Sequence, residues 1–217
     1  MELSDLVLTK HHDQTPVILS IPHGGEFLFS RYLPRFSLGD ALLIDTDLYT
    51  RKLYDNFQGT VITTNIAPHQ INMSRPSEVP TDTSLPPHMA GADCFHNTSL
   101  TGREILREPY RMEERQFLLQ FYEQYHFHLR DAIERMRAEQ GYAFMIDCHS
   151  LNSVAMKNTP DEGREREDLV VGTLEGKSAG SQILTNLHER LEDLCERYDF
   201  SLSYNDPYKG GFITQTY

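Results

Sequence analysis

The stretch Val17-Ile18-Leu19-Ser20-Ile21-Pro22-His23-Gly24-Gly25-Glu26 joins an apolar run to a glycine-rich turn that carries a histidine and a carboxylate. The apolar half is short, rich in branched side chains and bounded by proline, which is typical of a strand buried inside a parallel sheet. Two further runs of this kind occupy residues 61–64 and 143–146. We therefore predict three buried strands that belong to one sheet.

The segments around these strands repeat apolar residues at intervals of three and four, which predicts amphipathic helices. The longest pattern fills residues 109–140, with Pro109 suited to a first helical turn and Gly141 to the position beyond the helix end. Further helices are predicted over residues 45–57 and 183–198, whereas residues 76–101 and 158–168 have no period and are predicted to be irregular. Alternating strands and helices predict an α/β fold, in which ligands gather at the carboxyl ends of the strands.

The composition narrows the class of protein. The chain has 217 residues, 39% of them hydrophobic, which suffices for one domain with its own core. Its formal net charge of −12 argues against binding to nucleic acid or to an anionic membrane surface, but local cations can still hold a small anionic substrate. Cys94, Cys148 and Cys195 are too few and too widely spaced for a disulfide framework. Because no apolar stretch reaches the length of a signal peptide or a membrane span, we predict a soluble cytoplasmic protein, of unknown oligomeric state.

The polar residues that follow two of the strands form a candidate metal site. His23 and Glu26 come after the first strand, and the third strand runs into Asp147-Cys148-His149. Both histidines are expected at the carboxyl edge of the same sheet, and two imidazoles with one carboxylate are a common ligand set for catalytic zinc. A lone His-x-x-Glu pair is weak evidence, but its position directly after an apolar strand favours a ligand role. We therefore predict that His23, Glu26 and His149 bind one zinc ion.

Other residues near these strands have more than one interpretation. Arg75, which follows the second strand, is either a surface arginine or a guanidinium that grips a substrate carboxylate or stabilises an oxyanion. Asp147 either orients a metal ligand or caps the end of its strand. A catalytic Cys148 is a weaker hypothesis, because Cys148 and His149 are sequence neighbours and neighbours on a strand point to opposite faces.

The order of five motifs resembles the N-formylglutamate amidohydrolase family. The motifs lie between Val17 and Tyr217 and read S-I-P-H-G-G, D-T-D-L-Y-x-x-x-L-Y, N-M-S-R-P, D-C-H-S and N-D-P-Y-K-G-G-F-I-T. The resemblance implies a zinc-carboxypeptidase-like α/β fold, a three-layer sandwich with a central mixed, mostly parallel sheet. It also implies one zinc ion and hydrolysis of N-formyl-L-glutamate to formate and L-glutamate, at the end of histidine degradation.

The resemblance also implies roles for individual residues. His23 and Glu26 match the family's paired ligands, His149 matches the third ligand, and Arg75 matches the arginine that grips the substrate. In this family the arginine that binds the substrate is normally preceded by asparagine, and here Ser74 stands at that position. Lys209 is either a second cation for a dicarboxylate substrate or a solvated turn lysine. Tyr125 and His126 resemble a family Tyr-His pair, so His126 either touches the site or, as we expect, is a partly exposed helix histidine.

Besides Ser74, the chain departs from the family pattern in two further places. The D-T-D run leaves Asp45 and Asp47 as alternative carboxylate ligands, as partners of a ligand, or as a helix N-cap. The family's catalytic glutamate has no match before Tyr217, so the general base is unassigned and residues 1–217 are expected to form a single amidohydrolase domain without the family's C-terminal segment. Two alternatives follow, namely a deacylase for another N-acyl amino acid and a decayed hydrolase that only binds its ligand.

Overall fold

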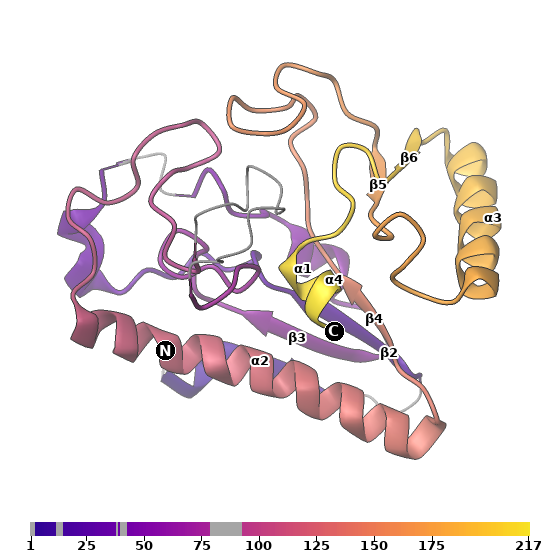
Figure 1. Ribbon diagram of the computed structural model, residues 1–217, viewed down its shortest axis with the longest axis horizontal. Coiled ribbons are helices and arrows are strands. Elements are labelled where there is room, and N and C mark those ends of the chain that lie inside the picture. The colour runs from indigo at the N-terminus through magenta and orange to yellow at the C-terminus, as the bar shows by residue number, and fades with distance from the viewer. Residues whose placement is uncertain (1–2, 12–14, 38, 40–42, 79–92) are drawn as a thin grey trace. The chain divides into compact units, whose positions relative to one another are not determined.

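The computed structural model describes residues 3–11, 15–37, 39, 43–78 and 93–217 (Figure 1). Contacts within the chain are concentrated in two compact units, Met1–Leu151 and Asn152–Tyr217. The first unit contains η1 (Leu3–Asp5), β1 (Val7–Lys10), β2 (Val17–Ile21), η2 (Ser30–Arg35), α1 (Thr50–Leu53), β3 (Thr60–Thr64), α2 (Met112–Gln140) and β4 (Phe144–Asp147). The second contains β5 (Leu169–Val171), α3 (Ser181–Tyr198), β6 (Leu202–Tyr204) and α4 (Phe212–Thr216).

A mixed four-stranded sheet in the order β1-β3-β2-β4 organises the first unit. Strands β3, β2 and β4 are parallel to one another, and β1 is antiparallel to β3. The three strands predicted from the sequence are confirmed, each within one residue of its predicted bounds. Strands β2 and β3 are buried as predicted, but the prediction of burial was wrong for β4, which ends the strand order and leaves Ile146 41% exposed. Strand β1 was not predicted, because only Val7 and Leu8 of its four residues are apolar, which is too short an apolar run to mark a strand. The mixed α/β architecture follows directly, with the carboxyl ends of β2, β3 and β4 at one edge.

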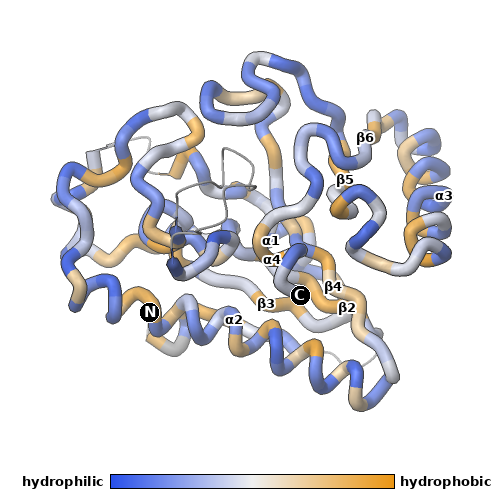
Figure 2. The backbone as a smooth tube through the Cα atoms, viewed as in Figure 1, coloured by the Kyte–Doolittle hydropathy of each residue, from blue (hydrophilic) through white to orange (hydrophobic). Residues whose placement is uncertain are grey.

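The two faces of β2 meet different partners, because successive side chains of a strand point to opposite sides. Ser20 faces helix α2, where its hydroxyl contacts the hydroxyl of Tyr125. Leu19 and Ile21 point the other way and pack with Val61 and Cys148, against which Tyr54 and Phe57 also lie. Figure 2 shows the apolar residues concentrated in β2 and β4, whereas polar and apolar residues alternate along α2.

Helix α2 packs along the sheet and follows the predicted pattern closely (Figure 1). It begins at Met112, where the Glu114 carboxylate accepts the backbone N–H of Arg111, and it ends at Gln140, followed by Gly141 with a φ of 81° that suits glycine. Its buried residues are Leu118, Phe121, Tyr122, Tyr125, His126, Leu129, Ala132 and Met136. The expectation that His126 is partly exposed was therefore wrong, since only 4% of this residue is accessible.

The helix predicted over residues 45–57 is much shorter in the structure. Helix α1 covers only Thr50–Leu53, and its N-cap is Tyr49 in a left-handed conformation rather than Asp45 or Asp47. The backbone N–H of Asp47 donates to the carbonyl of His23, and that of Leu48 donates to Thr46. These bonds hold residues 45–48 as a loop beside the end of β2. Residues 45–48 are therefore not helical, because these backbone N–H groups already donate to acceptors outside a helical pattern.

The second unit is a parallel β5–β6 pair joined by α3. The Asp168 carboxylate accepts both the backbone N–H and the hydroxyl of Ser201, which fastens the start of the strand pair. Residues 158–168 contain no helix or strand, as predicted, and Arg166 pairs with Asp161 there at 2.7 Å. Residues 93–101 are likewise irregular, while residues 79–92 of the predicted irregular segment lie outside the described residues. Nowhere in the described ranges is a helix both long and apolar enough to cross a membrane.

Candidate metal centre

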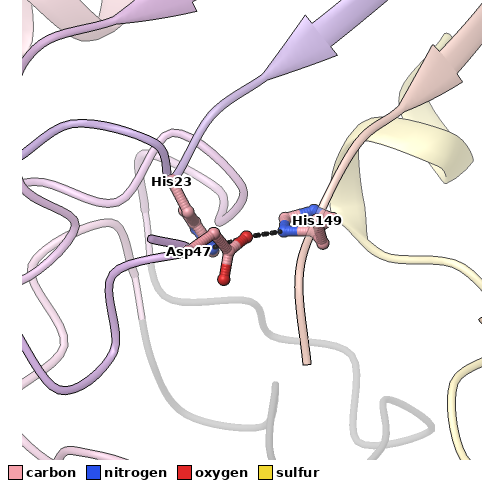
Figure 3. A group of neighbouring side chains, drawn as sticks. All are labelled: His23, Asp47 and His149. Carbon is pink, nitrogen blue, oxygen red and sulfur yellow. Dashed lines mark hydrogen bonds and ion pairs between the residues drawn. The ribbon is translucent and has the colours of Figure 1, made fainter. Parts of the chain in front are cut away.

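Three side chains from distant parts of the first unit converge at the carboxyl edge of the sheet. His23 follows β2, His149 follows β4, and Asp47 lies in the loop before α1 (Figure 3). Asp47 Oδ2 lies 2.8 Å from His149 Nδ1 and 3.7 Å from His23 Nδ1. One ligand atom from each residue lies within 4.8 Å of the other two. The arrangement therefore presents two ring nitrogens and one carboxylate oxygen to a common point.

The backbone explains why these residues meet. His23 and His149 follow neighbouring parallel strands, whose register pairs Ser20 with Asp147. The carbonyl of His23 accepts the N–H of Asp47, which draws the loop to the sheet edge. The Asp47 carboxylate also accepts the backbone N–H of Ser150. Each member of the group is thus fixed by main-chain bonds close to its own side chain.

The far side of each imidazole is held by a polar partner. Asn72 Oδ1 accepts the N–H of Ser74 and lies 2.8 Å from His23 Nε2, so His23 donates from Nε2. Asp147 Oδ2 lies 3.2 Å from His149 Nε2, and a carboxylate oxygen accepts, so His149 also donates from Nε2. Both rings therefore direct Nδ1 toward Asp47. Partners of this kind set the tautomer and orientation of metal-binding histidines, which agrees with the orienting role considered for Asp147.

The charges of the group are arranged to hold a cation. Burial by itself lowers the pKa of His149, but Asp147 and Asp47 outweigh it and raise this pKa well above its ordinary value. The pKa of His23 is lowered, mainly by burial and to a smaller extent by the positive charge of His149, while the negative charge of Asp47 opposes this effect. Burial by itself raises the pKa of Asp47, but the hydrogen bond and charge of His149 hold it below the usual range. His149 is thus an imidazolium between two carboxylates, and the proton that its Nδ1 shares with Asp47 lies where a metal ion would bind and must leave before that nitrogen can act as a ligand.

A second polar group surrounds Arg75, close to the histidines in the fold. Burial lowers the pKa of the Arg75 guanidinium, and Asp45 and Asp93 oppose this effect without forming an ion pair with it. Burial, and then the charges of Arg75, His69 and His23, keep the pKa of His96 well below its ordinary value, so His96 is neutral.

Three buried polar atoms in this second group lack a partner. Across the described residues, Ser74 Oγ, Arg75 Nη1 and His96 Nδ1 have no hydrogen-bond partner. Buried polar atoms without a partner are costly, so a ligand that supplies acceptors there would be bound favourably. The group is suited to an anion.

The comparison with known families decides the family of this chain. The family model described as N-formylglutamate amidohydrolase matches residues 15–217. The chain belongs to the N-formylglutamate amidohydrolase family. A relative from Pseudomonas putida named N-formylglutamate deformylase is 30% identical, and the match covers 98% of this chain and 78% of that protein. A deformylase of the same name from Pseudomonas aeruginosa is 29% identical, with 98% and 79% covered.

Solved structures agree on the fold. The crystal structure of an N-formylglutamate amidohydrolase from Ralstonia eutropha JMP134 matches with a TM-score of 0.76 and 19% identity, covering 97% of this chain and 79% of that one. A gene product of Agrobacterium tumefaciens matches with a TM-score of 0.62 and 16% identity, covering 94% and 74%. The mixed α/β fold of this N-formylglutamate amidohydrolase family member is thus shared with solved proteins.

The predicted ligand Glu26 lies apart from the two histidines. Its side chain is exposed, and the group of potential ligands contains Asp47 instead. The reason is the path of the chain after β2. Gly25 packs against the backbone of Asn65 and Ile66, and Phe27 N–H donates to the Asn65 carbonyl. Residues 25–27 therefore run along the segment after β3, and the carboxylate position is filled from the D-T-D run.

Asp45 and Cys148, two other residues considered for the site, are held in structural environments. Asp45 Oδ2 lies 2.7 Å from His69 Nε2, and the Asp45 carboxylate accepts the N–H of Leu100. Burial raises the pKa of Cys148 to about 12, so the thiol stays protonated and is a poor nucleophile. The structure thus gives no support to a catalytic Cys148.

Lys209, the predicted second substrate cation, belongs to the second unit. It pairs with Glu175 at 2.5 Å, and both side chains are more than half exposed. Within that unit it is a solvated ion pair, which corresponds to the alternative considered for a turn lysine.

Three residues of this region were not predicted from the sequence. Asn72 could have been found, because it begins the N-M-S-R-P motif that already marked Ser74 and Arg75. His69 and His96 lie in stretches without a pattern, and only the fold brings them near Arg75.

We predict that Gly25→Ala destabilises the protein by about 3 kcal/mol and weakens metal binding. A Cβ at this position would lie 2.5 Å from the Ile66 carbonyl oxygen and would also overlap the Asn65 carbonyl, so backbone must move. Gly24→Ala is the matched control, because its Cβ would meet side-chain atoms of Arg51 and Ile21 rather than backbone, and side chains can shift more easily. Urea denaturation of both variants measures the difference. Equal losses of stability in the two variants would contradict the prediction.

Proposed function

We propose that this protein is a zinc-dependent N-formylglutamate deformylase, which hydrolyses N-formyl-L-glutamate with water to formate and L-glutamate. The observation that carries the proposal is the group of His23, Asp47 and His149 at the carboxyl edge of the sheet. The names of the Pseudomonas relatives support the substrate. The zinc-carboxypeptidase-like three-layer arrangement, the single domain over residues 1–217 and the cytoplasmic location belong to the same proposal.

The donor set fits zinc. Two imidazole nitrogens and one carboxylate oxygen leave a fourth position of a tetrahedral ion open, as in catalytic zinc sites. Tetrahedral bonds to nitrogen and oxygen place the ligand atoms about 3.3 Å apart. The group spans up to 4.8 Å, so a small inward movement of the side chains completes the site. Asp47 is our choice for the carboxylate, because Glu26 is exposed and outside the group.

Each side chain has a task in hydrolysis. His23, Asp47 and His149 would hold the zinc ion, which would supply Lewis-acid polarisation of the formyl carbonyl and a lower pKa for the attacking water. Asn72 and Asp147 keep the ligand atoms of His23 and His149 directed at the ion. Arg75 binds a carboxylate of the substrate, with Ser74 beside it, because both carry buried polar atoms without a partner in the described part of the chain. Lys209 is a weaker choice for that carboxylate, since it is already paired with Glu175.

The proposal is tested by metal content and turnover together. Elemental mass spectrometry of untagged protein should find about one zinc per chain, and formate release from N-formyl-L-glutamate should depend on that zinc. Chelation should stop the reaction, and added zinc should restore it. If the protein binds zinc but releases no formate, the assigned substrate is refuted. If it binds no zinc, the proposed zinc dependence is refuted.

A further inference from the structure

One chain of hydrogen bonds links helix α2 to the metal group. Tyr125 Oη lies 2.8 Å from Ser20 Oγ, and Ser20 Oγ donates to Asp147 Oδ1 over 2.9 Å. Because the single hydroxyl proton of Ser20 goes to Asp147, Tyr125 must be the donor to Ser20. The other oxygen of Asp147 faces His149 Nε2. The Tyr125 and Ser20 residues are completely buried, so water does not compete for these bonds.

The same face of α2 holds the loop that carries Arg75. Tyr122 Oη donates to the Arg75 carbonyl over 2.8 Å, and His126 Nε2 donates to the Met73 carbonyl over 3.0 Å. The rings of Tyr122 and His126 pack together with their centroids 4.2 Å apart. Burial lowers the pKa of His126 to about 4, so the ring is neutral near pH 7. A carbonyl only accepts, so the proton of this neutral ring is on Nε2.

We propose that two tyrosines on α2 are positioning residues with separate tasks, resting on the proposed function. Tyr125 acts through Ser20 and Asp147 to orient His149, and so sets the affinity for zinc. Tyr122, together with His126, fixes the main chain at Met73 and Arg75, and so sets the affinity for the anionic substrate.

The physical basis is the low tolerance of a metal site for misaligned ligands. Removing a group that orients a metal-binding histidine typically weakens metal affinity by 10- to 100-fold. Ser20 contacts Asp147 directly, so Ser20→Ala should weaken zinc binding by about tenfold or more. Tyr125 is one step further away, so Tyr125→Phe should weaken it by several-fold, up to about tenfold.

The test is a crossed comparison of Tyr125→Phe and Tyr122→Phe, each of which removes one hydroxyl from the same helix. Zinc affinity of the metal-free proteins is measured by competition with a chromophoric chelator, and KM and kcat for N-formyl-L-glutamate are measured at saturating zinc. We expect weaker zinc affinity only in Tyr125→Phe, and a several-fold higher KM with nearly unchanged kcat only in Tyr122→Phe. Tyr142→Phe, which alters an exposed tyrosine, is the control for both.

A double-mutant cycle tests whether Tyr125 works through Ser20. If it does, the Ser20→Ala/Tyr125→Phe protein binds zinc no more weakly than Ser20→Ala alone. A merely structural role predicts instead that both phenylalanine variants lose similar stability while neither zinc affinity nor KM changes selectively, and that result would overturn the proposal. The parent protein distinguishes a failure of the positioning roles from a failure of the proposed function. If the parent does not bind zinc or does not release formate, the proposed function is refuted. If the parent does both, but the two phenylalanine variants do not differ in zinc affinity and KM as expected, only the positioning roles are refuted.

Discussion

His149→Ala is expected to weaken zinc binding by more than about a hundredfold, which exceeds the usual effect of losing a group that merely orients a ligand. The change removes the nitrogen that lies nearest to Asp47 and leaves His23 and Asp47 as the remaining donors. Zinc per chain, measured by elemental mass spectrometry after dialysis, should fall from about one to near zero. The side chain is 31% exposed, so we expect the variant to remain folded.

Three further variants make this result specific. His128→Ala alters a helix histidine outside the metal group and should keep its zinc. Asp47→Ala should lose zinc as His149→Ala does, whereas Glu26→Ala should retain it, because of these two carboxylates it is Asp47 that lies within ligand distance of both histidines. Zinc retained in Asp47→Ala and lost in Glu26→Ala would return the carboxylate ligand to the His-x-x-Glu pair and contradict the assignment made from the structure.

Arg75→Met is expected to lower kcat/KM for N-formyl-L-glutamate by roughly 30- to 4000-fold, while zinc content stays at one per chain. Losing one partner of a buried, hydrogen-bonded charge pair costs about 2–5 kcal/mol, which corresponds to this range. Methionine keeps much of the side-chain volume and removes the charge, so the packing around Asp45 and Asp93 changes little. Steady-state kinetics of formate release measure the effect.

Neutral substrates reveal what Arg75 recognises. N-formylglutamine lacks the side-chain charge of the natural candidate, and the α-amide of N-formylglutamate lacks the other charge. For the analogue that has lost the carboxylate bound by Arg75, parent and variant should have nearly equal kcat/KM. An arginine variant that loses its zinc, or one that discriminates charged from neutral substrates as the parent does, would contradict the binding role of Arg75.

The sequence predicted the parts of the fold that depend on local patterns. Strand β2 was predictable because its apolar run stops at proline, and α2 because its stripe of apolar residues lasts for many turns. His126 was misjudged because histidine is polar, although it lies four residues after Tyr122 and three before Leu129 on the buried stripe. Its burial depends on the Met73 carbonyl, which a local pattern does not reveal.

The carboxylate of the metal group shows where local patterns are insufficient. His23 and His149 could be predicted because each directly follows a strand, and the ends of neighbouring parallel strands meet. The choice between Glu26 and Asp47 depends on the path of two loops. Gly25 leads Glu26 away along the segment after β3, and the His23 carbonyl draws Asp47 inward. Both effects are main-chain contacts between segments far apart in the sequence.

The spacing of the metal group along the chain has a thermodynamic consequence. Asp47 and His149 are 102 residues apart, and they meet only because β2 and β4 are paired. An unfolded chain offers no comparable cluster, so a metal ion that binds this group binds the native state almost alone. The free energy of unfolding should then rise by about 1.4 kcal/mol for each tenfold increase in free metal above the dissociation constant. The concentration of free zinc would therefore determine the thermal stability of the protein as well as its rate of turnover.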